Sequence, residues 1–212
     1  MSDNYKQQLE TYLSGLVPLR PLELQKMEAY AKQHEFPIIG AACGHFCYQV
    51  ARMIGARKIF ELGSGYGYST AWFAQAVQEN GGGAVHHVVW DEELSKMARQ
   101  HLKAMGFEGI IRYRVSEAVQ ALRESEGPFD LIFNDINKDA YPASLPVIES
   151  KLRSGGILIV DNMIWDGRVF DDREQSVETE AIRELTRLIT TSNKWIASLI
   201  PMRDGLMMAM KK

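Results

Sequence analysis

The spacing of apolar positions changes near residue 55 of this 212-residue chain. Before it, apolar residues recur every three or four positions and predict helices over residues 5–16, 22–31 and 41–54. After it, short and nearly continuous apolar runs alternate with amphipathic stretches. The runs are KIFEL, AVHHVVW, GIIRYRV, FDLIFND and GGILIVD, and the helices between them are expected from Tyr68, over 92–104, near Glu117 and over 141–152. This alternation predicts a doubly wound α/β fold with a mostly parallel sheet and helices on both faces.

The C-terminal part departs from this alternation. A predicted helix over 177–190 is followed by KWIASLI and GLMMAMK, which are separated by PMRDG. Two strand-like runs joined by a short turn are typical of an antiparallel hairpin, here at the edge of the sheet. We therefore expect a single domain, 1–212, with a helical arm and one further helix in 1–55 and the α/β core in 56–212.

Composition and charge narrow the choice of ligand. With 46% hydrophobic residues, 24% charged residues and a net charge of -3, the chain is typical of globular proteins and lacks the positive balance that nucleic-acid binding requires. It has neither a leader-like N-terminus nor a run of about 20 apolar residues, so we expect a cytoplasmic protein without a membrane partner. Cys43 and Cys47 allow a disulfide or a metal pair, but base rates favour small buried core residues.

A glycine-rich segment, FELGSGYGYST at 60–70, follows the first predicted strand. Ligands of parallel sheets bind beyond the carboxyl ends of the strands, where glycines let the backbone approach them. A nicotinamide-binding turn would have its third glycine at the position of Tyr68, and a P-loop would need a Lys followed by Ser or Thr. Glu61 would repel a phosphate and suits a cationic ligand. The segment therefore favours S-adenosylmethionine, with a plain tight turn as the alternative.

The second strand is expected to end near a carboxylate that holds ribose hydroxyl groups. The first acid after this strand is Asp91, which either contacts the ribose or caps the next helix. His86 and His87 are interpreted as ordinary strand residues.

Polar residues also follow the fourth and fifth predicted strands. Asp135 on one strand end and Asp161 with Asn162 on the next should meet at the same edge of the sheet. Two carboxylates and an amide oxygen suit Mg²⁺ best, with Mn²⁺ or Ca²⁺ as alternatives, and helix capping is the competing interpretation. Lys138 lies beside this cluster, where a neighbouring cation would favour its neutral form and make it a candidate general base.

Taken together, these segments resemble the class I, metal-dependent O-methyltransferases of the caffeoyl-CoA and catechol type. The resemblance rests on FELGSGYGYST, DLIFNDINKDAYP and GGILIVDNMIWDGRV, and extends to GAACGHF and RDGLMMAMK. It implies a seven-stranded methyltransferase fold, S-adenosylmethionine as methyl donor, a divalent cation and a homodimer.

The resemblance also implies roles for individual residues. Lys138 would be the catalytic base, Trp165 would wall the acceptor site, and Asp135, Asp161 and Asn162 would bind the metal. The implied cofactor contacts are Ile39, Glu61, Gly63, Ser64, Gly65, Tyr68, Ser69, Asp91, Ala118 and Asp135.

Three positions depart from the family pattern. Val89 stands where a ribose-binding acid is usual, so Asp91 must substitute for it or the contact is missing. Asn137 replaces the second acid of the common DADK, and Asn134 replaces an apolar residue. Cofactor affinity is the property that these changes affect.

We therefore expect an S-adenosylmethionine- and metal-dependent O-methyltransferase that acts on a small catechol-like acceptor with vicinal hydroxyl groups. The alternative, prompted by Val89, is a binding protein with the cofactor fold but no methyltransferase activity. An NAD-dependent oxidoreductase shares the sheet but is opposed by Tyr68. Arg20 and Arg168 are either contacts for an anionic acceptor or ordinary surface charges.

Overall fold

The structure is a computed structural model that describes residues 3–212. Three helices come first: α1 (Asp3–Gly15), α2 (Leu22–Gln33) and α3 (Gly40–Met53). Strands and helices then alternate: β1 (Lys58–Leu62), α4 (Tyr68–Glu79), β2 (Ala84–Val89), α5 (Glu92–Ala104), β3 (Ile111–Val115), α6 (Ala118–Glu124), β4 (Phe129–Asn134), η1 (Lys138–Ala140), α7 (Tyr141–Lys151) and β5 (Leu152–Val160). The chain ends with η2 (Trp165–Phe170), α8 (Val177–Thr190), β6 (Trp195–Ile200) and β7 (Leu206–Lys211).

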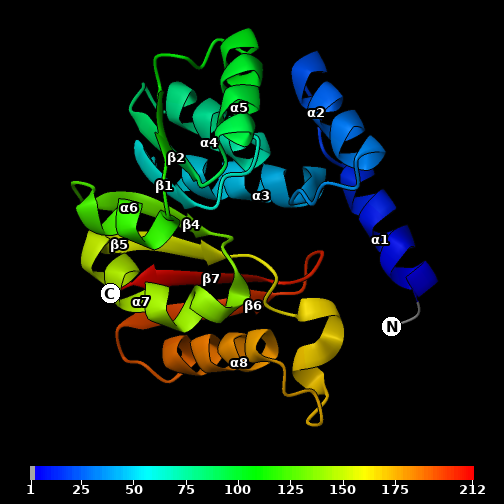
Figure 1. Cartoon of the computed structure of the whole chain (residues 1–212), viewed down its shortest axis with the longest axis vertical. Coiled ribbons are helices and arrows are strands. Elements are labelled where there is room, and N and C mark those ends of the chain that lie inside the picture. Colours follow the sequence, from blue (N-terminus) through cyan, green and yellow to red (C-terminus); the bar gives the residue numbers. More distant parts are fainter. Residues whose placement is uncertain (1–2) are drawn as a thin grey trace.

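The seven strands form one sheet in the order β3-β2-β1-β4-β5-β7-β6. The first five pair in parallel, whereas β7 runs antiparallel to both β5 and β6. In Figure 1, β5 points toward the gold η2 segment and the red β7 runs back the other way. The predicted doubly wound sheet with an antiparallel C-terminal hairpin is confirmed.

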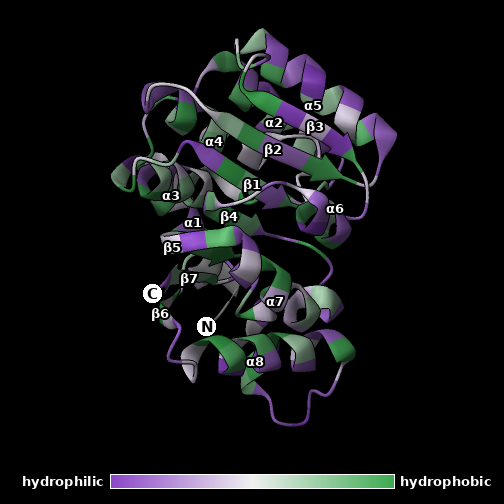
Figure 2. Cartoon of the chain, turned by 90° about the vertical axis from the view of Figure 1, so that its left-hand side faces the viewer, coloured by the Kyte–Doolittle hydropathy of each residue, from purple (hydrophilic) through white to green (hydrophobic). Residues whose placement is uncertain are grey.

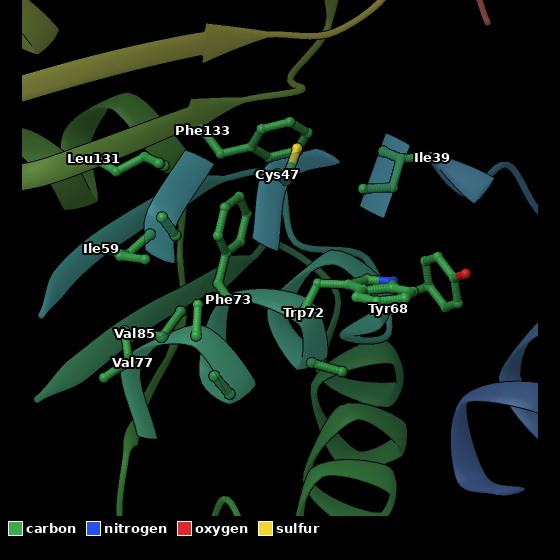
Figure 3. Packing of buried hydrophobic residues seen from close by; sticks show 14 of the residues in the cluster. Ile39, Cys47, Ile59, Tyr68, Trp72, Phe73, Val77, Val85, Leu131 and Phe133 are labelled. Carbon is green, nitrogen blue, oxygen red and sulfur yellow. The ribbon is translucent and has the colours of Figure 1, made fainter. Parts of the chain in front are cut away.

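The sheet is buried on both faces because successive strand residues point to opposite sides. Ile59 belongs to a core cluster that includes residues of α2 to α5 on one face, and its neighbour Phe60 belongs to a second cluster that includes residues of α6 to α8 on the other. Figure 3 shows the first face, where Phe73 and Val77 of α4 lie against the strands. The covering helices α5 and α8 alternate polar and apolar residues (Figure 2), so each buries one side and exposes the other.

Two short 3₁₀ segments, η1 and η2, were not predicted, and β5 begins earlier than the run GGILIVD. Both segments follow strands at the carboxyl edge of the sheet, where the candidate site lies. Within residues 3–212, no helix combines the length and apolar character needed to cross a membrane.

Candidate active site at the carboxyl edge of the sheet

The loop between β1 and α4 passes very close to the end of β4. Gly63 has φ +84°, and a Cβ atom built there would lie only 2.4 Å from the carbonyl oxygen of Asp135. Ser64 ties the same loop to β2, because its N–H donates to the carbonyl of Val88 and its Oγ accepts from the Val88 N–H, each at 2.9 Å. The glycine is therefore required by close backbone approach, and the loop is fixed to both neighbouring strands.

Glu61 lies under this loop and is completely buried. Thr70 donates a hydrogen bond to its Oε2, whereas Oε1 has no partner among the described residues. Burial raises the pKa of the Glu61 carboxyl to about 7, although neighbouring hydroxyl groups lower it. A cationic group placed beside Glu61 would stabilise its carboxylate, which fits the ligand charge expected from the sequence.

A histidine extends this buried network. The Nδ1 atom of His87 lies 3.0 Å from Oγ1 of Thr70, and its Nε2 atom is buried without a partner. Burial lowers the pKa of His87 to about 3, so the ring is neutral. His86 packs against the rings of Phe60 and Phe129, which also contact each other. Both histidines are strand residues as predicted, but His87 supports Thr70 and through it Glu61.

The other expected cofactor residues surround this loop. Ile39 is buried at the start of α3, Ser69 is buried in the first turn of α4, and Ala118 begins α6. The hydroxyl of Tyr68 donates to Glu28 of α2 at 2.8 Å, so Tyr68 connects α4 to the N-terminal helices. Gly65 has φ +49°.

The end of β2 carries no buried acid. Val89 is the last residue of the strand and is buried, and the following Trp90 is 77% exposed. Asp91 accepts a hydrogen bond from the N–H of Leu94 at 2.9 Å and caps α5. The capping role is therefore present, whereas a ribose contact by Asp91 stays a prediction.

The residues after β4 and β5 lie side by side, as the sheet order requires. The N–H of Asp135 donates to Leu62 at 2.9 Å, and the N–H of Asp161 donates to Asn134 at 3.1 Å. Lys138 donates to Oδ1 of Asp135 at 2.8 Å. The structure thus brings Asp135, Lys138 and Asp161 to one part of the sheet edge.

Asp161 is almost completely buried, and its Oδ1 has no partner among the described residues. Burial, and next the charge of Asp135, raise the pKa of the Asp161 carboxyl to about 6, while Arg203 lowers it. Arg203 donates to Oδ2 of Asp161 at 3.0 Å. Asn162, with φ +57°, donates through Nδ2 to Asp204 at 3.1 Å, which leaves its amide oxygen as an acceptor.

The donor set at this edge combines carboxylate and amide oxygens, which are ligands of divalent cations. Within residues 3–212, no three His, Cys, Asp or Glu side chains are grouped to hold a metal. The candidate set contains only two carboxylates, because its third member is the amide of Asn162. An orphaned, buried carboxylate oxygen beside a second carboxylate and an amide oxygen is the hard-oxygen environment that Mg²⁺ or Mn²⁺ prefers. The residues therefore fit the cation.

Two aromatic rings lie near Lys138, that of the completely buried Tyr141 and that of Trp165. The Nζ of Lys138 lies 5.1 Å from the ring centre of Tyr141 and 6.0 Å from that of Trp165. Trp165 begins η2 with φ +52°, and Arg168 lies 5.6 Å above its ring. These rings and cations would suit a flat, electron-rich acceptor.

A family model described as O-methyltransferase matches residues 19–212. The chain belongs to the O-methyltransferase family. It is 28% identical over 178 residues to a catechol O-methyltransferase of Niastella koreensis, covering 80% of either chain. It is 32% identical over 167 residues to catechol O-methyltransferase domain-containing protein 1 of Mus musculus, covering 76% of this chain and 63% of the mouse protein. The fold matches an O-methyltransferase from Bacillus cereus in complex with SAH, with a TM-score of 0.87, 25% identity and 97% of either chain covered.

Membership of the O-methyltransferase family confirms the predicted family, while the roles of single residues stay predictions. Cys43 and Cys47 are free and buried in α3, as expected. Asn137 is exposed, and the buried Asn134 donates to Ser144 rather than toward the site. Arg20 pairs with Glu28 at 2.7 Å.

Two residues of the candidate site, Arg203 and Asp204, were not predicted from the sequence motifs. Both lie in the turn between β6 and β7, at the start of the segment RDGLMMAMK that shares the family resemblance, but the sequence predicts no role for either residue. The sheet topology could have indicated these two residues. Because β7 runs antiparallel to β5, the turn before β7 lies beside the residues that follow β5.

Proposed function

We propose that this chain transfers a methyl group from S-adenosylmethionine to one hydroxyl of a small acceptor with vicinal aromatic hydroxyl groups. We further propose that a divalent cation is required, with Mg²⁺ preferred. The acceptor class is supported by the two relatives whose names contain catechol O-methyltransferase and by the Trp165 ring near Lys138.

Three side chains would hold the cation: Asp135, Asp161 and Asn162. When bound, the cation would lower the pKa of an acceptor hydroxyl, and the cofactor would supply an electrophilic methyl group. Lys138 would take up the hydroxyl proton at Nζ. Proton uptake would produce an ammonium group beside Asp135, which is the ion pair present in the structure at 2.8 Å. Asp135 would thereby stabilise the product state of proton transfer.

Glu61 and the glycine loop would orient the cofactor. The fixed loop offers backbone close to the ligand, and Glu61 offers a buried carboxylate to a cation. Trp165 would wall the acceptor and exclude water from it. Most of the acceleration would then come from holding both reactants in one cleft.

The observation that carries this proposal is the buried Oδ1 of Asp161, which has no partner within the described residues and lies in a family-typical cluster with Asp135, Asn162 and Lys138. A plain capping role would not require an unpaired carboxylate in the protein interior, where it is costly.

Calorimetric titration of the metal-free protein tests the proposal. We expect S-adenosylmethionine to bind, and a catechol acceptor to bind only with Mg²⁺ present. Asp135→Ala should abolish methyl transfer, and Glu126→Ala, an exposed position, serves as the control. Full activity of thoroughly metal-free protein would exclude the metal requirement.

One observation favours a second candidate, a binding protein without turnover. Val89 provides no carboxylate at the ribose position and Asp91 is engaged as a helix cap. Absence of cofactor binding in the same titration, with no turnover across an acceptor panel, would support this candidate. We also propose a homodimer, which light scattering would detect as twice the mass of one chain.

A further inference from the structure

The three donor side chains of the proposed cation site each have one polar atom already held by a charged neighbour. The contacts are Lys138 to Oδ1 of Asp135 at 2.8 Å, Arg203 to Oδ2 of Asp161 at 3.0 Å, and Nδ2 of Asn162 to Asp204 at 3.1 Å. Each donor is thereby left with one oxygen for a cation. Outer contacts of this kind orient metal ligands in proteins generally.

Asp161 is the most constrained of the three. Its N–H donates to Asn134 at 3.1 Å, and its carbonyl accepts from the hydroxyl of Tyr141 at 2.8 Å. Its side chain is 2% exposed, and Arg203 occupies Oδ2. Because backbone and one carboxylate oxygen are both fixed, only the buried Oδ1 is available to a ligand.

The turn that carries Arg203 is itself attached to the segment after β5. The N–H of Ile164 donates to the carbonyl of Asp204 at 2.7 Å, and the N–H of Met163 donates to Gly205 at 3.0 Å. Gly205 has φ +87°, and a Cβ there would lie 2.6 Å from the side chain of Ile164. The backbone of the turn is therefore fixed against Met163 and Ile164, which directly follow the proposed cation ligands Asp161 and Asn162.

We propose that Arg203 restricts Asp161 to a single ligand oxygen and so makes the site selective for Mg²⁺ and Mn²⁺ over Ca²⁺. The inference rests on the proposed metal-dependent function. Ca²⁺ takes six to eight oxygens and commonly uses both oxygens of a carboxylate, whereas Mg²⁺ uses one oxygen from each of one or two carboxylates and keeps several waters. With Oδ2 of Asp161 in the ion pair, two-oxygen binding requires that the pair be broken.

The positive charge of Arg203 also affects cation binding directly, and the test must separate this effect from the coordination of Asp161. A cation beside the site weakens the binding of every divalent ion, and it does so about equally for ions of the same charge. The ratio of the Ca²⁺ and Mg²⁺ dissociation constants cancels this common effect and reports the coordination of Asp161.

The experiment measures Mn²⁺ binding to the full chain by electron paramagnetic resonance, without cofactor, followed by displacement with Mg²⁺ or Ca²⁺. The variants are Arg203→Gln, which removes the ion pair, and Arg203→Lys, which keeps the charge. Arg168→Gln removes a nearby cation that contacts Trp165 and not Asp161, and so controls for charge. Circular dichroism melts verify that each variant is folded.

We expect wild type to prefer Mg²⁺ over Ca²⁺ and Arg203→Gln to reduce this preference about tenfold. Arg168→Gln should keep the wild-type ratio, and Arg203→Lys should keep most of it. An unchanged ratio in folded Arg203→Gln overturns the inference while the metal site stands. If Mn²⁺ does not bind wild type, or binds Asp161→Asn equally well, the metal part of the proposed function fails and the inference fails with it.

Discussion

Gly63 occupies a position where both conformation and space exclude a side chain. In Gly63→Ala the new Cβ would meet the backbone of Asp135 at 2.4 Å, and backbone atoms cannot yield as a flexible side chain would. Gly81→Ala is the matched control, because Gly81 has a similar φ of +92° with open space around it. We expect urea unfolding to show that Gly63→Ala costs about 2 kcal/mol more than Gly81→Ala. Equal losses would mean that backbone conformation alone explains the glycine.

Glu61 allows a prediction about pH. Burial raises the pKa of its carboxyl from 4.5 to about 7, so the folded protein binds this proton more tightly than the unfolded chain does. The stability that results is fully present below pH 4.5 and is lost as the pH rises through 7. At 1.36 kcal/mol per pKa unit this loss is roughly 3 kcal/mol.

Glu61→Gln has no such loss, because its amide does not ionise. Its stability relative to wild type, measured by urea unfolding, should therefore increase between pH 4.5 and pH 7 and stay level above. Glu126→Gln, at an exposed position, should show a flat difference. A flat difference for Glu61→Gln as well would contradict a raised pKa.

The residues of the glycine loop were predictable from sequence because they are local to one motif. Glu61, Gly63 and Ser64 follow one another around a single strand end. The support that His87 gives to Glu61 through Thr70 could not be predicted from the sequence, because it depends on the strand register that pairs Glu61 with His87 across β1 and β2.

At the scale of elements, the β6–β7 turn is coupled to η2. The carboxylate of Asp204 accepts from Nδ2 of Asn162 at 3.1 Å and from the N–H of Asp166 at 2.7 Å. Asp204→Ala should therefore cost about 1–3 kcal/mol and release the segment that carries Trp165. Faster hydrogen exchange over residues 163–170 and weaker acceptor binding are the expected readouts. Asp172→Ala, an exposed aspartate close by in sequence, should change neither.

The strands were predicted because their apolar runs are continuous, and the helices because their apolar positions recur at helical spacing. The segment Trp165–Phe170 was not predicted as an element, because Trp165, Asp166 and Gly167 all have positive φ. The N–H of Asp166 donates to Asp204 at 2.7 Å, a contact distant in sequence that helps to hold this backbone.

At the scale of the whole molecule, α1 is attached to the domain and is not part of its core. Its described side chains include none that is fully buried, and the family match begins only at residue 19. Even so, α1 packs on α3 near Gly40, where a Cβ would lie 3.7 Å from Glu10. That contact adjoins Ile39 and hence the proposed cofactor site. Figure 1 shows α1 on the side of the molecule toward which β5 points.

Deletion of residues 1–16 should therefore weaken acceptor binding more than it lowers the stability of the fold. Because little apolar surface of α1 is buried, we expect the free energy of unfolding to fall by no more than about 1 kcal/mol and cofactor affinity to change less than about threefold. Acceptor affinity should fall more, since α1 lies on the side of the molecule toward which β5 points, and the proposed cation and acceptor residues follow that strand (Figure 1). Calorimetry with S-adenosylmethionine and with a catechol acceptor measures both. Loss of cofactor binding would mean that α1 supports the proposed cofactor site through Ile39. Unchanged acceptor affinity would mean that acceptor specificity resides in η2 and the β6–β7 turn.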